Sequence, residues 1–518
     1  MISIDRSLSL PAHQDRTLIE VIDGSGRAEE TYTYRRVRVL RDRLAQGLTL
    51  PPGTRVGLVA GNTPAWVVAD LALLAKGLVE VPVPLAFSAE QAVSLLRDTE
   101  ICLVDVPGAR RLREWGLDTG RTVLPIDLDE LAGAADGAPH GPAPSTTPAP
   151  ASLSYPTNPD DVIKVIHTSG TTGTPKGVRI RAAGIEAVVD SLATVIPDDA
   201  FQRYLSLVPL SLLIEQITAV YLPVRTGGTL VLLPPGSALL GTAGARAEDA
   251  LEWMRGARAT GAVLPPAVVS ALDKAALKEG EGAAGALFAT PAPPFLMAGG
   301  AAVDPEALRR LGARGIDVHE GYGLSENSSV VAWNRPGEIA PGTVGRPLPH
   351  CEVRLSEDGE LLVTSSSLFA GYTVEDPTSR PVRDGWLHTG DRASIDEAGR
   401  ITILGRLKNV IITSHGRNVS PEWVEGRLRS CRQVRECVVF GDALEHLVAL
   451  VLTEADADPD LVRGEVLGYA AQHLAETDRP ERVVVVADGP ELRALYFTVT
   501  GRPRRHALFA DLVSAHLS

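Results

Sequence analysis

Short apolar runs alternate with segments of helical spacing in the N-terminal part of the chain, and this alternation constrains the fold most strongly. Apolar residues recur at helical spacing from Tyr34 to Leu48, Arg55 to Ala60 is typical of a short strand, and Ala65 to Lys76 is again helical. Strands that alternate with helices are typical of layered α/β architectures with largely parallel sheets. We therefore predict an α/β fold for this part of the chain.

A second pattern, of α+β type, begins near Lys408. The chain has 518 residues, which is too long for one ordinary domain. The expected strands and helices of the second part are Val410 to Ile412, Pro421 to Cys431, Cys437 to Phe440, Leu447 to Thr453, Asp460 to Ala475 and Val483 to Val486. We expect a large domain over residues 1–407 and a smaller C-terminal domain over residues 408–518.

The stretch from Ala132 to Asp160 consists mostly of Ala, Pro, Gly, Ser and Thr, including the run from Pro142 to Pro150. Such a composition cannot supply a packed core. We predict an exposed, mobile surface loop inside the large domain over residues 132–160, rather than a domain boundary.

Composition excludes several classes of partner. The net charge of −14 argues against a nucleic acid or an anionic membrane surface, because both attract basic proteins. The apolar stretch from Val67 to Leu85 is interrupted by charged residues and prolines, so it is too polar to span a bilayer. The first residues lack the charged and apolar regions of a signal peptide. We expect a cytoplasmic enzyme.

The four cysteines are widely scattered, and this spacing is weak evidence for a metal site. Cys431 and Cys437 are close in sequence but have no further Cys or His at ligand spacing. We expect buried thiols in a reducing compartment.

The loop Thr168-Ser169-Gly170-Thr171-Thr172-Gly173-Thr174-Pro175-Lys176-Gly177 follows the apolar run Val162 to Ile166, which we predict to be a buried strand. Glycines let the backbone approach an anion, backbone N–H groups and hydroxyls donate to its oxygens, and Lys176 supplies a positive charge. The Walker pattern is absent, because Gly177 follows Lys176. The loop therefore indicates phosphate binding outside the P-loop NTPase class.

Further motifs follow in order along the chain: Glu320-Gly321-Tyr322-Gly323-Leu324-Ser325-Glu326, Gly342 to Pro347, Gly359 to Leu361, Trp386 to Asp391, and Gly405-Arg406-Leu407-Lys408. Together with the Gly-rich loop they resemble the adenylate-forming (AMP-binding) superfamily, which includes acyl-CoA synthetases, aryl-CoA ligases, luciferases and peptide-synthetase adenylation domains. The resemblance covers nearly the whole chain. It implies a large domain of two αβ sandwiches and a small β-barrel, followed by a mobile α+β lid domain.

The resemblance also implies roles for individual residues. The β- and γ-phosphates of ATP would be held by Thr168, Ser169, Gly170, Thr171, Thr172, Gly173 and Lys176. Adenine and ribose would be held by Gly299, Gly300, Ala301, Glu320, Gly321, Tyr322, Gly323, Ser325, Asp391 and Arg406. Glu326 would anchor Mg²⁺, Lys408 would be the hinge between the domains, and Lys176, Glu326 and Arg502 would be the catalytic residues.

One departure from the family pattern lies at Thr500-Gly501-Arg502. At this position the family carries a lysine that bridges the α-phosphate and the substrate carboxylate, whereas this chain has Arg502 and no lysine beyond Lys408. A planar guanidinium is not a conservative replacement for a compact ammonium. Two explanations remain open: a compositional preference for arginine, or a change of mechanism.

A second departure lies in Val208 to Gln216, which resembles the Pro-Leu-Ser/Ala-His segment of long-chain acyl-CoA synthetases. Leu212 occupies the place of the usual His, next to Ser211, and this indicates an altered substrate pocket. His167 stands where the family often has an aromatic residue, and it is either a third pocket residue or a packed core histidine. The stretch Thr413 to Pro421 resembles the loop that enters the site for the second half-reaction.

Three functions remain open from the sequence. The first is an ATP-dependent ligase that adenylates an acid and passes it to CoA or to the phosphopantetheine of an acyl carrier protein. The second is a diazotase of natural-product pathways (secondary metabolism), which adenylates nitrite and reacts it with an aromatic amine. The third is a catalytically weak ATP-binding sensor. The expected cofactors of the first two are ATP and Mg²⁺.

Overall fold

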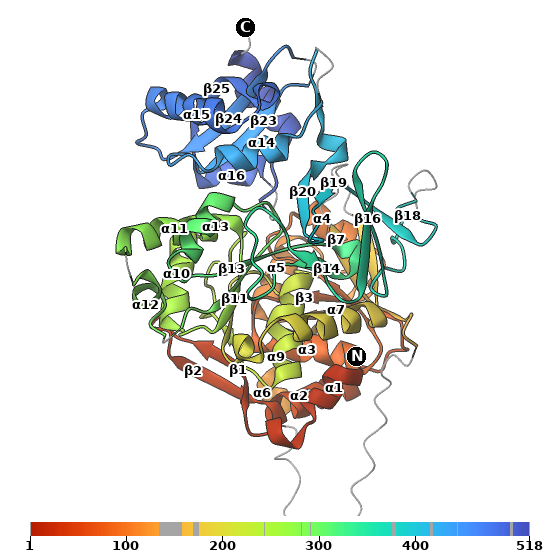
Figure 1. Ribbon diagram of the computed structural model, residues 1–518. Helices are drawn as coiled ribbons and strands as arrows, with labels where there is room; N and C mark the ends of the chain where they lie inside the picture. The colour runs from red at the N-terminus through yellow and green to blue at the C-terminus, as the bar shows by residue number, and fades with distance from the viewer. Residues whose placement is uncertain are drawn as a thin grey trace, which may run out of the picture.

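The computed structural model describes residues 2–133, 158–168, 176–242, 244–280, 282–290, 292–374, 380–414, 418–442, 444–497 and 501–516. Figure 1 shows a large part, coloured red to cyan, and a smaller blue C-terminal part that sits at one end of it. Most of the loop expected over residues 132–160 lies outside the described residues, so its mobility stays a prediction.

A six-stranded sheet has the strand order β6-β5-β3-β4-β7-β8. Its strands are β3 (Arg55–Val59), β4 (Val79–Pro82), β5 (Ile101–Val104), β6 (Thr122–Pro125), β7 (Val162–Thr168) and β8 (Lys176–Arg181). All neighbours pair in parallel except β7 and β8, which form an antiparallel pair. The largely parallel sheet predicted from the alternation is confirmed here.

A nine-stranded sheet has the order β15-β14-β13-β12-β11-β9-β10-β1-β2. Its strands are β1 (Thr17–Ile22), β2 (Ala28–Thr33), β9 (Tyr204–Ser206), β10 (Leu230–Leu232), β11 (Gly261–Leu264), β12 (Phe295–Ala298), β13 (Val318–Leu324), β14 (Ser329–Trp333) and β15 (Arg346–Pro347). The run from β1 to β13 is parallel, and β2, β14 and β15 pair antiparallel at its two ends.

Helices pack against these two sheets. They are α1 (Ile2–Leu8), α2 (Tyr34–Gly47), α3 (Pro64–Ala75), α4 (Ala89–Leu95), α5 (Val106–Glu114), α6 (Leu128–Gly133), α7 (Ala182–Val195), α8 (Leu213–Glu215), α9 (Leu222–Thr226), α10 (Ala247–Gly256), α11 (Pro266–Glu279), α12 (Ala283–Phe288) and α13 (Pro305–Gly312). Every residue of α3 after its first proline is buried, because the helix is apolar on nearly all sides and lies within the main core. The helices predicted at α2 and α3 are confirmed within a residue or two.

A smaller antiparallel sheet completes the large part of the molecule. Its strands are β16 (Cys351–Leu355), β17 (Glu360–Ser365), β18 (Val382–Arg383), β19 (Trp386–Ile395) and β20 (Ile401–Arg406). The large part therefore consists of two αβ layers and a half-barrel, as the resemblance implied.

The C-terminal part is a separate α/β unit. It contains the pair β21 (Ile411–Ile412) and β22 (Asn418–Val419), and the sheet β23 (Glu436–Phe440), β24 (Leu447–Thr453) and β25 (Pro480–Ala487), together with α14 (Pro421–Leu428), α15 (Pro459–His473), α16 (Pro490–Tyr496) and α17 (Arg505–Leu508). Alternate residues of β23 and β24 enter two different apolar clusters, which cover opposite faces of the sheet. Both clusters consist of residues from Ile411 onward, and we keep the domain division at residue 408 as a proposal.

The four cysteines are free and buried, as expected. Burial raises the pKa of the Cys351 thiol to about 11 and that of Cys431 to about 12. The described thiols are therefore protonated and inert near neutral pH.

Candidate active site

The predicted phosphate loop joins the antiparallel strands β7 and β8. Thr168 and Lys176 form the last backbone pair of this hairpin. Ser169, Gly170, Thr171, Thr172 and Gly173 lie outside the described residues, so their role as phosphate ligands stays a prediction.

The base of this hairpin is fixed against the segment that precedes residue 375. The Thr373 N–H donates to the Gly177 carbonyl oxygen over 2.8 Å, and the Arg179 N–H donates to the Gly371 carbonyl oxygen over 3.0 Å. A Cβ atom on Gly177 would lie 2.7 Å from the Thr373 side chain and 2.8 Å from that of Val165. The approach therefore requires a glycine at position 177.

Glu326 lies in a short 3₁₀ turn, Ser325–Asn327, between β13 and β14. The Tyr372 hydroxyl donates to Glu326 Oε1 over 2.8 Å, and the Phe369 N–H donates to the Glu326 carbonyl oxygen over 2.9 Å. Burial, followed by the charge of Glu326, raises the pKa of Tyr372, so that the hydroxyl remains a donor. Tyr372 was not singled out from the sequence.

Asp391 is buried where β19 and β20 pair, directly opposite Arg406. Its Oδ1 atom lies 2.7 Å from Arg406 Nε, and its Oδ2 atom accepts a hydrogen bond from the Tyr322 hydroxyl. Burial raises the pKa of Asp391, while Arg406 and Tyr322 act in the opposite direction. A carboxylate has about four lone-pair sites, so Asp391 can still accept from ribose hydroxyls.

The Trp386-to-Asp391 motif is organised by Glu360, a residue that sequence reasoning named only as part of a segment. Glu360 Oε1 accepts from the Gly390 N–H over 2.8 Å, and its Oε2 lies 2.7 Å from His388 Nδ1. Arg406 Nη1 also donates to the Thr389 carbonyl oxygen over 3.2 Å. These contacts hold the strand that presents Asp391.

The predicted adenine wall lies where β12 ends beside the middle of β13. A Cβ atom on Gly299 would lie 3.1 Å from the Gly321 carbonyl oxygen, so the two segments are in close contact. Glu320 is buried, and its Oε1 accepts from the Val303 N–H over 3.2 Å. Burial raises the pKa of Glu320 to about 8, so the carboxyl is neutral near pH 7. Gly300, with φ +85°, leads into Ala301.

Arg502, a residue of the C-terminal part, interacts electrostatically with the predicted ribose and magnesium residues of the large part. Gly501 has φ +76°, and Phe497 and Pro503 pair across the turn that carries Arg502. Burial is the first cause of a lowered guanidinium pKa, and Arg406 adds to it, whereas Asp391, Glu326 and Tyr322 act to raise the pKa. Arg502 therefore lies within electrostatic reach of the predicted ribose and magnesium residues, while its side chain keeps contact with solvent.

Lys408 is exposed in the short turn Leu407–Asn409 that follows β20. Near it, Asn409 Nδ2 donates to Glu422 Oε1 over 2.6 Å, and the Ser420 hydroxyl donates to the Leu404 carbonyl oxygen. Residues 415–417, the centre of the loop expected to serve the second half-reaction, lie outside the described residues. The hinge role of Lys408 stays a prediction.

The segment that carries Ser211 and Leu212 is positioned by Asn62. Asn62 Nδ2 donates to Ser206 Oγ over 3.0 Å and to the Val208 carbonyl oxygen over 2.9 Å, and its Oδ1 accepts from the Leu210 N–H over 2.8 Å. No periodicity or motif in the sequence pointed to this residue.

His167 belongs to β7, and burial lowers its pKa to about 4. The ring is therefore neutral, and its Nδ1 has no hydrogen-bond partner among the described residues.

The described residues contain no group of three or more His, Cys, Asp or Glu side chains that would form a metal cage. A Mg²⁺ ion that is bound with ATP usually needs only one or two carboxylates, because phosphates and waters supply the other ligands. Glu326, held by Tyr372, fits that requirement.

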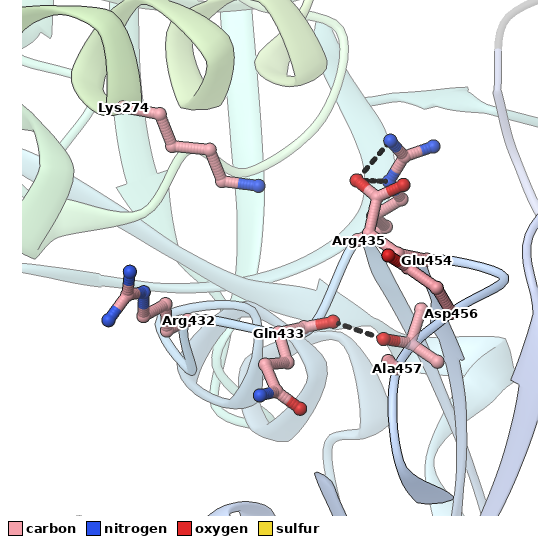
Figure 2. Close-up of a pocket in the computed structure, with 8 residues that line it drawn as sticks. Lys274, Arg432, Gln433, Arg435, Glu454, Asp456 and Ala457 are labelled. Carbon is pink, nitrogen blue, oxygen red and sulfur yellow. Dashed lines mark hydrogen bonds and ion pairs between the residues drawn. The ribbon is translucent and has the colours of Figure 1, made fainter. Parts of the chain in front are cut away.

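A separate pocket of about 280 Å³ lies where α11 approaches the C-terminal part (Figure 2). It is lined by Lys274, Arg432, Gln433, Arg435, Thr453, Glu454, Asp456 and Ala457. None of the site residues predicted from the sequence lines it, so it is distinct from the candidate active site.

Comparison with protein families identifies the class. A model described as AMP-binding enzyme matches residues 10–373, and a model described as AMP-binding enzyme C-terminal domain matches residues 408–477. The first match covers more than half of the chain. The protein belongs to the AMP-binding family of ATP-dependent, adenylate-forming ligases.

Individual relatives are distant. The chain is 29% identical over 464 residues to the long-chain-fatty-acid–CoA ligase FadD15 of Mycobacterium bovis, covering 79% of this chain and 74% of that protein. It is 29% identical over 522 residues to 3-[(3aS,4S,7aS)-7a-methyl-1,5-dioxo-octahydro-1H-inden-4-yl]propanoyl:CoA ligase of Rhodococcus jostii, covering 93% and 95%. Among solved structures, the anthranilate CoA ligase AuaEII in complex with anthranoyl-AMP superposes with a TM-score of 0.80 at 21% identity, covering 100% of this chain and 98% of that one. This last likeness shows the fold.

None of the described helices has both the length and the apolar character needed to cross a membrane.

Proposed function

We propose that this protein is an ATP-dependent acid ligase that forms an acyl-adenylate and then a thioester. The observation that carries the proposal is the contact of Asp391 with Tyr322 and Arg406, which brings three distant motifs together, with Arg502 in electrostatic reach of them. Two relatives bear the names of CoA ligases, which supports CoA as the thiol acceptor. The phosphopantetheine of a carrier protein has the same thiol chemistry.

In the first half-reaction a carboxylate oxygen attacks the α-phosphorus of ATP, and the bond to the bridging oxygen of pyrophosphate breaks. Both partners are anions, so the site must offset negative charge rather than activate a nucleophile. Arg502 provides a fixed positive charge, and Asp391 with Tyr322 and Arg406 would orient the ribose. In the second half-reaction a thiolate attacks the acyl carbon, and AMP leaves.

The pyrophosphate side of the site rests on the hairpin loop between β7 and β8 and on Glu326. A bound Mg²⁺ would neutralise phosphate charge as the pyrophosphate leaves. Tyr372 would keep the Glu326 carboxylate in one orientation, since its hydroxyl donates to Oε1. Lys176 would add a second positive charge at the end of the hairpin.

A diazotase is the second candidate, and two specific residues favour it. Leu212 stands where the long-chain acyl-CoA synthetases that this segment resembles carry a histidine near the substrate carboxylate. Arg502 stands where the family pattern has a lysine beside that carboxylate. A small inorganic anion such as nitrite needs neither group.

AMP and pyrophosphate release separates these functions. We would measure both products with a panel of aryl and fatty acids, each with and without nitrite and an arylamine, and with Asp391→Asn as a control that should lose AMP formation. Turnover with a carboxylic acid alone supports the ligase. Turnover that needs nitrite and amine supports the diazotase, and ATP binding without products with any of these compounds supports the sensor.

A further inference from the structure

An unusual helix lies directly after the segment that carries Ser211 and Leu212. α8 (Leu213–Glu215) continues into a π-helical stretch, Gln216–Tyr221, before α9 begins. All six residues of the π-helical stretch are buried. Such stretches are rare and occur frequently at functional sites, where the wider turn changes the direction of side chains.

Glu215 anchors the start of this helix to β9. The Tyr204 hydroxyl donates to Glu215 Oε2 over 3.1 Å. Burial raises the pKa of Glu215 to about 8, so the group is neutral near pH 7. Glu215 Oε1 has no hydrogen-bond partner among the described residues.

Two further polar side chains of the same segment are also unpartnered. Ser211 Oγ, one turn before Glu215, and both Oε1 and Nε2 of Gln216 have no hydrogen-bond partner among the described residues. Glu215 and Gln216 are 0% exposed, and Ser211 is 9% exposed. Burying polar atoms without partners destabilises a protein, so such a cluster needs another reason to be retained.

The position of the cluster relates it to the adenylation residues. α8 contacts β14, the π-helical stretch contacts β9, and β14 pairs with β13. β13 carries Tyr322, and the turn between β13 and β14 carries Glu326. The cluster therefore lies next to the strand pair that would hold the nucleotide, in the segment where the sequence places the acid.

We propose that Ser211, Glu215 and Gln216 form a specificity subsite that hydrogen-bonds a polar substituent of the substrate acid. The substrate class that follows is a small hydroxy- or amino-substituted acid, rather than an unbranched fatty acid. This inference rests on the proposed acid adenylation. A polar substituent would pair with the unpartnered atoms, whereas an alkyl chain would leave them buried without partners, and such sites discriminate strongly.

The test compares matched acids on wild type and on Gln216→Leu. We would measure kcat/KM for AMP formation with benzoate, its hydroxy- and amino-substituted forms, and straight-chain acids, together with the Tm of each variant. Wild type should favour a substituted acid over its unsubstituted parent by about 100-fold. Gln216→Leu should reduce that ratio by at least about tenfold and leave the Tm unchanged or raised, because an unpartnered amide is replaced by an apolar side chain.

Thr218→Val is the matched control. Thr218 is buried in the same helix, but its hydroxyl is paired with the Tyr204 hydroxyl over 2.8 Å and with the Ile214 carbonyl oxygen over 2.9 Å. Its removal should lower the Tm and leave the ratio between substituted and unsubstituted acids unchanged.

Three results would overturn the inference while the proposed function stands. These are a wild type that prefers straight-chain acids, an unchanged ratio in Gln216→Leu, and a Tm loss in Gln216→Leu equal to that in Thr218→Val. Absence of AMP formation with every acid would overturn the proposed ligase itself, and the subsite with it.

Discussion

Arg502 occupies a position of competing charges. Asp391 and Glu326 favour its charged form, whereas burial and the neighbouring Arg406 disfavour it. A guanidinium tolerates this competition because its intrinsic pKa is so high that it stays charged in proteins. A lysine at the same place would lie beside Arg406 with a lower intrinsic pKa. We therefore interpret the arginine as fitted to its neighbours.

Replacing Arg502 tests that interpretation. Arg502→Ala should slow AMP formation by about 100-fold to 1,000-fold, the usual effect of removing a group that stabilises developing charge. Arg502→Lys should also be slower than wild type, because the planar fork is lost. Single-turnover AMP formation is the measurement, and Arg504→Lys, at an exposed neighbouring arginine, is the control. A lysine variant that is faster on every substrate would show that position 502 is not adapted to arginine.

Glu215 makes stability depend on pH in a defined direction. Its pKa is about 8 in the folded protein and about 4.3 in an unfolded chain, so the folded state holds this proton more tightly. The contribution of Glu215 to stability is therefore fully present below pH 4.3 and is lost as the pH rises to about 8. Glu215→Gln cannot ionise, so its Tm should fall less than that of wild type between pH 5 and pH 8.

Thermal unfolding across that pH range measures this effect. Glu397→Gln, at an exposed surface position, is the control and should follow wild type. Glu320 also has a pKa near 8, so the wild-type slope should be shared between two buried carboxyls. Parallel curves for Glu215→Gln and wild type would mean that Glu215 is ionised in the fold.

At the scale of elements, the antiparallel pair β13–β14 sets the spacing of the residues predicted to bind the nucleotide. Gly321 packs under the Trp333 ring, and a Cβ atom added to it would lie 2.6 Å from a ring carbon. A Cβ atom added to Gly323 would lie 1.9 Å from the Ser329 carbonyl oxygen. Both glycines flank Tyr322, which donates to Asp391. The motif glycines therefore serve close backbone packing as well as nucleotide access.

Gly323→Ala should separate the two strands. The clash is with backbone, which cannot move aside like a flexible side chain, so we expect a loss of about 2 kcal/mol or more in the free energy of unfolding. Chemical denaturation measures it. Gly468→Ala is the control, because its Cβ meets nothing within 4 Å in the helix α15, and it should be stabilising by about 0.5 to 1 kcal/mol. Equal stability of Gly323→Ala and wild type would contradict the packing role.

The sequence predicted elements best where a period was clear. The helical spacing of α2 and α3 and the apolar runs of β7 and β24 located these elements closely, because one face or both faces must be buried, whereas the run Val483 to Val486 gave only the middle of β25. The π-helical stretch after Glu215 had no such signal, since no period distinguishes it from an α-helix. Asn62 and Tyr372 were missed because their roles depend on contacts with residues more than forty positions away. Motifs pointed to Tyr322, Asp391 and Arg406, which contact one another in the structure, but they gave no role to Glu360, which holds the strand that presents Asp391.

At the scale of the molecule, the C-terminal part supplies Arg502 while the large part supplies its carboxylate neighbours (Figure 1). A further contact between the two parts lies just after the C-terminal end of α14. The Ser430 hydroxyl donates to Asp304 Oδ1 over 2.6 Å, and Asp304 also caps α13 by accepting from the Glu306 and Ala307 N–H groups. Lys274 of α11 and Arg432 of the C-terminal part both line the pocket of Figure 2.

The Ser430–Asp304 hydrogen bond connects a large-part helix cap with the C-terminal part in the orientation that brings Arg502 to Asp391. If the C-terminal part turns between the two half-reactions, as the family resemblance implies, this bond favours the first orientation over the second. Removing a single hydrogen bond changes such a balance by about 1 kcal/mol, which corresponds to about fivefold in population. The effect on overall stability should be small, because the side chain is only partly buried.

Ser430→Ala should therefore slow single-turnover AMP formation by up to about fivefold and leave thioester formation from the acyl-adenylate unchanged or faster. The two steps are measured separately, by rapid quench with ATP and acid and by mixing isolated acyl-adenylate with CoA. Ser514→Ala is the control, because that hydroxyl donates to Ala510 within its own helical turn and should affect neither step. Equal slowing of both steps in Ser430→Ala would mean that the bond supports the fold of the C-terminal part rather than its orientation.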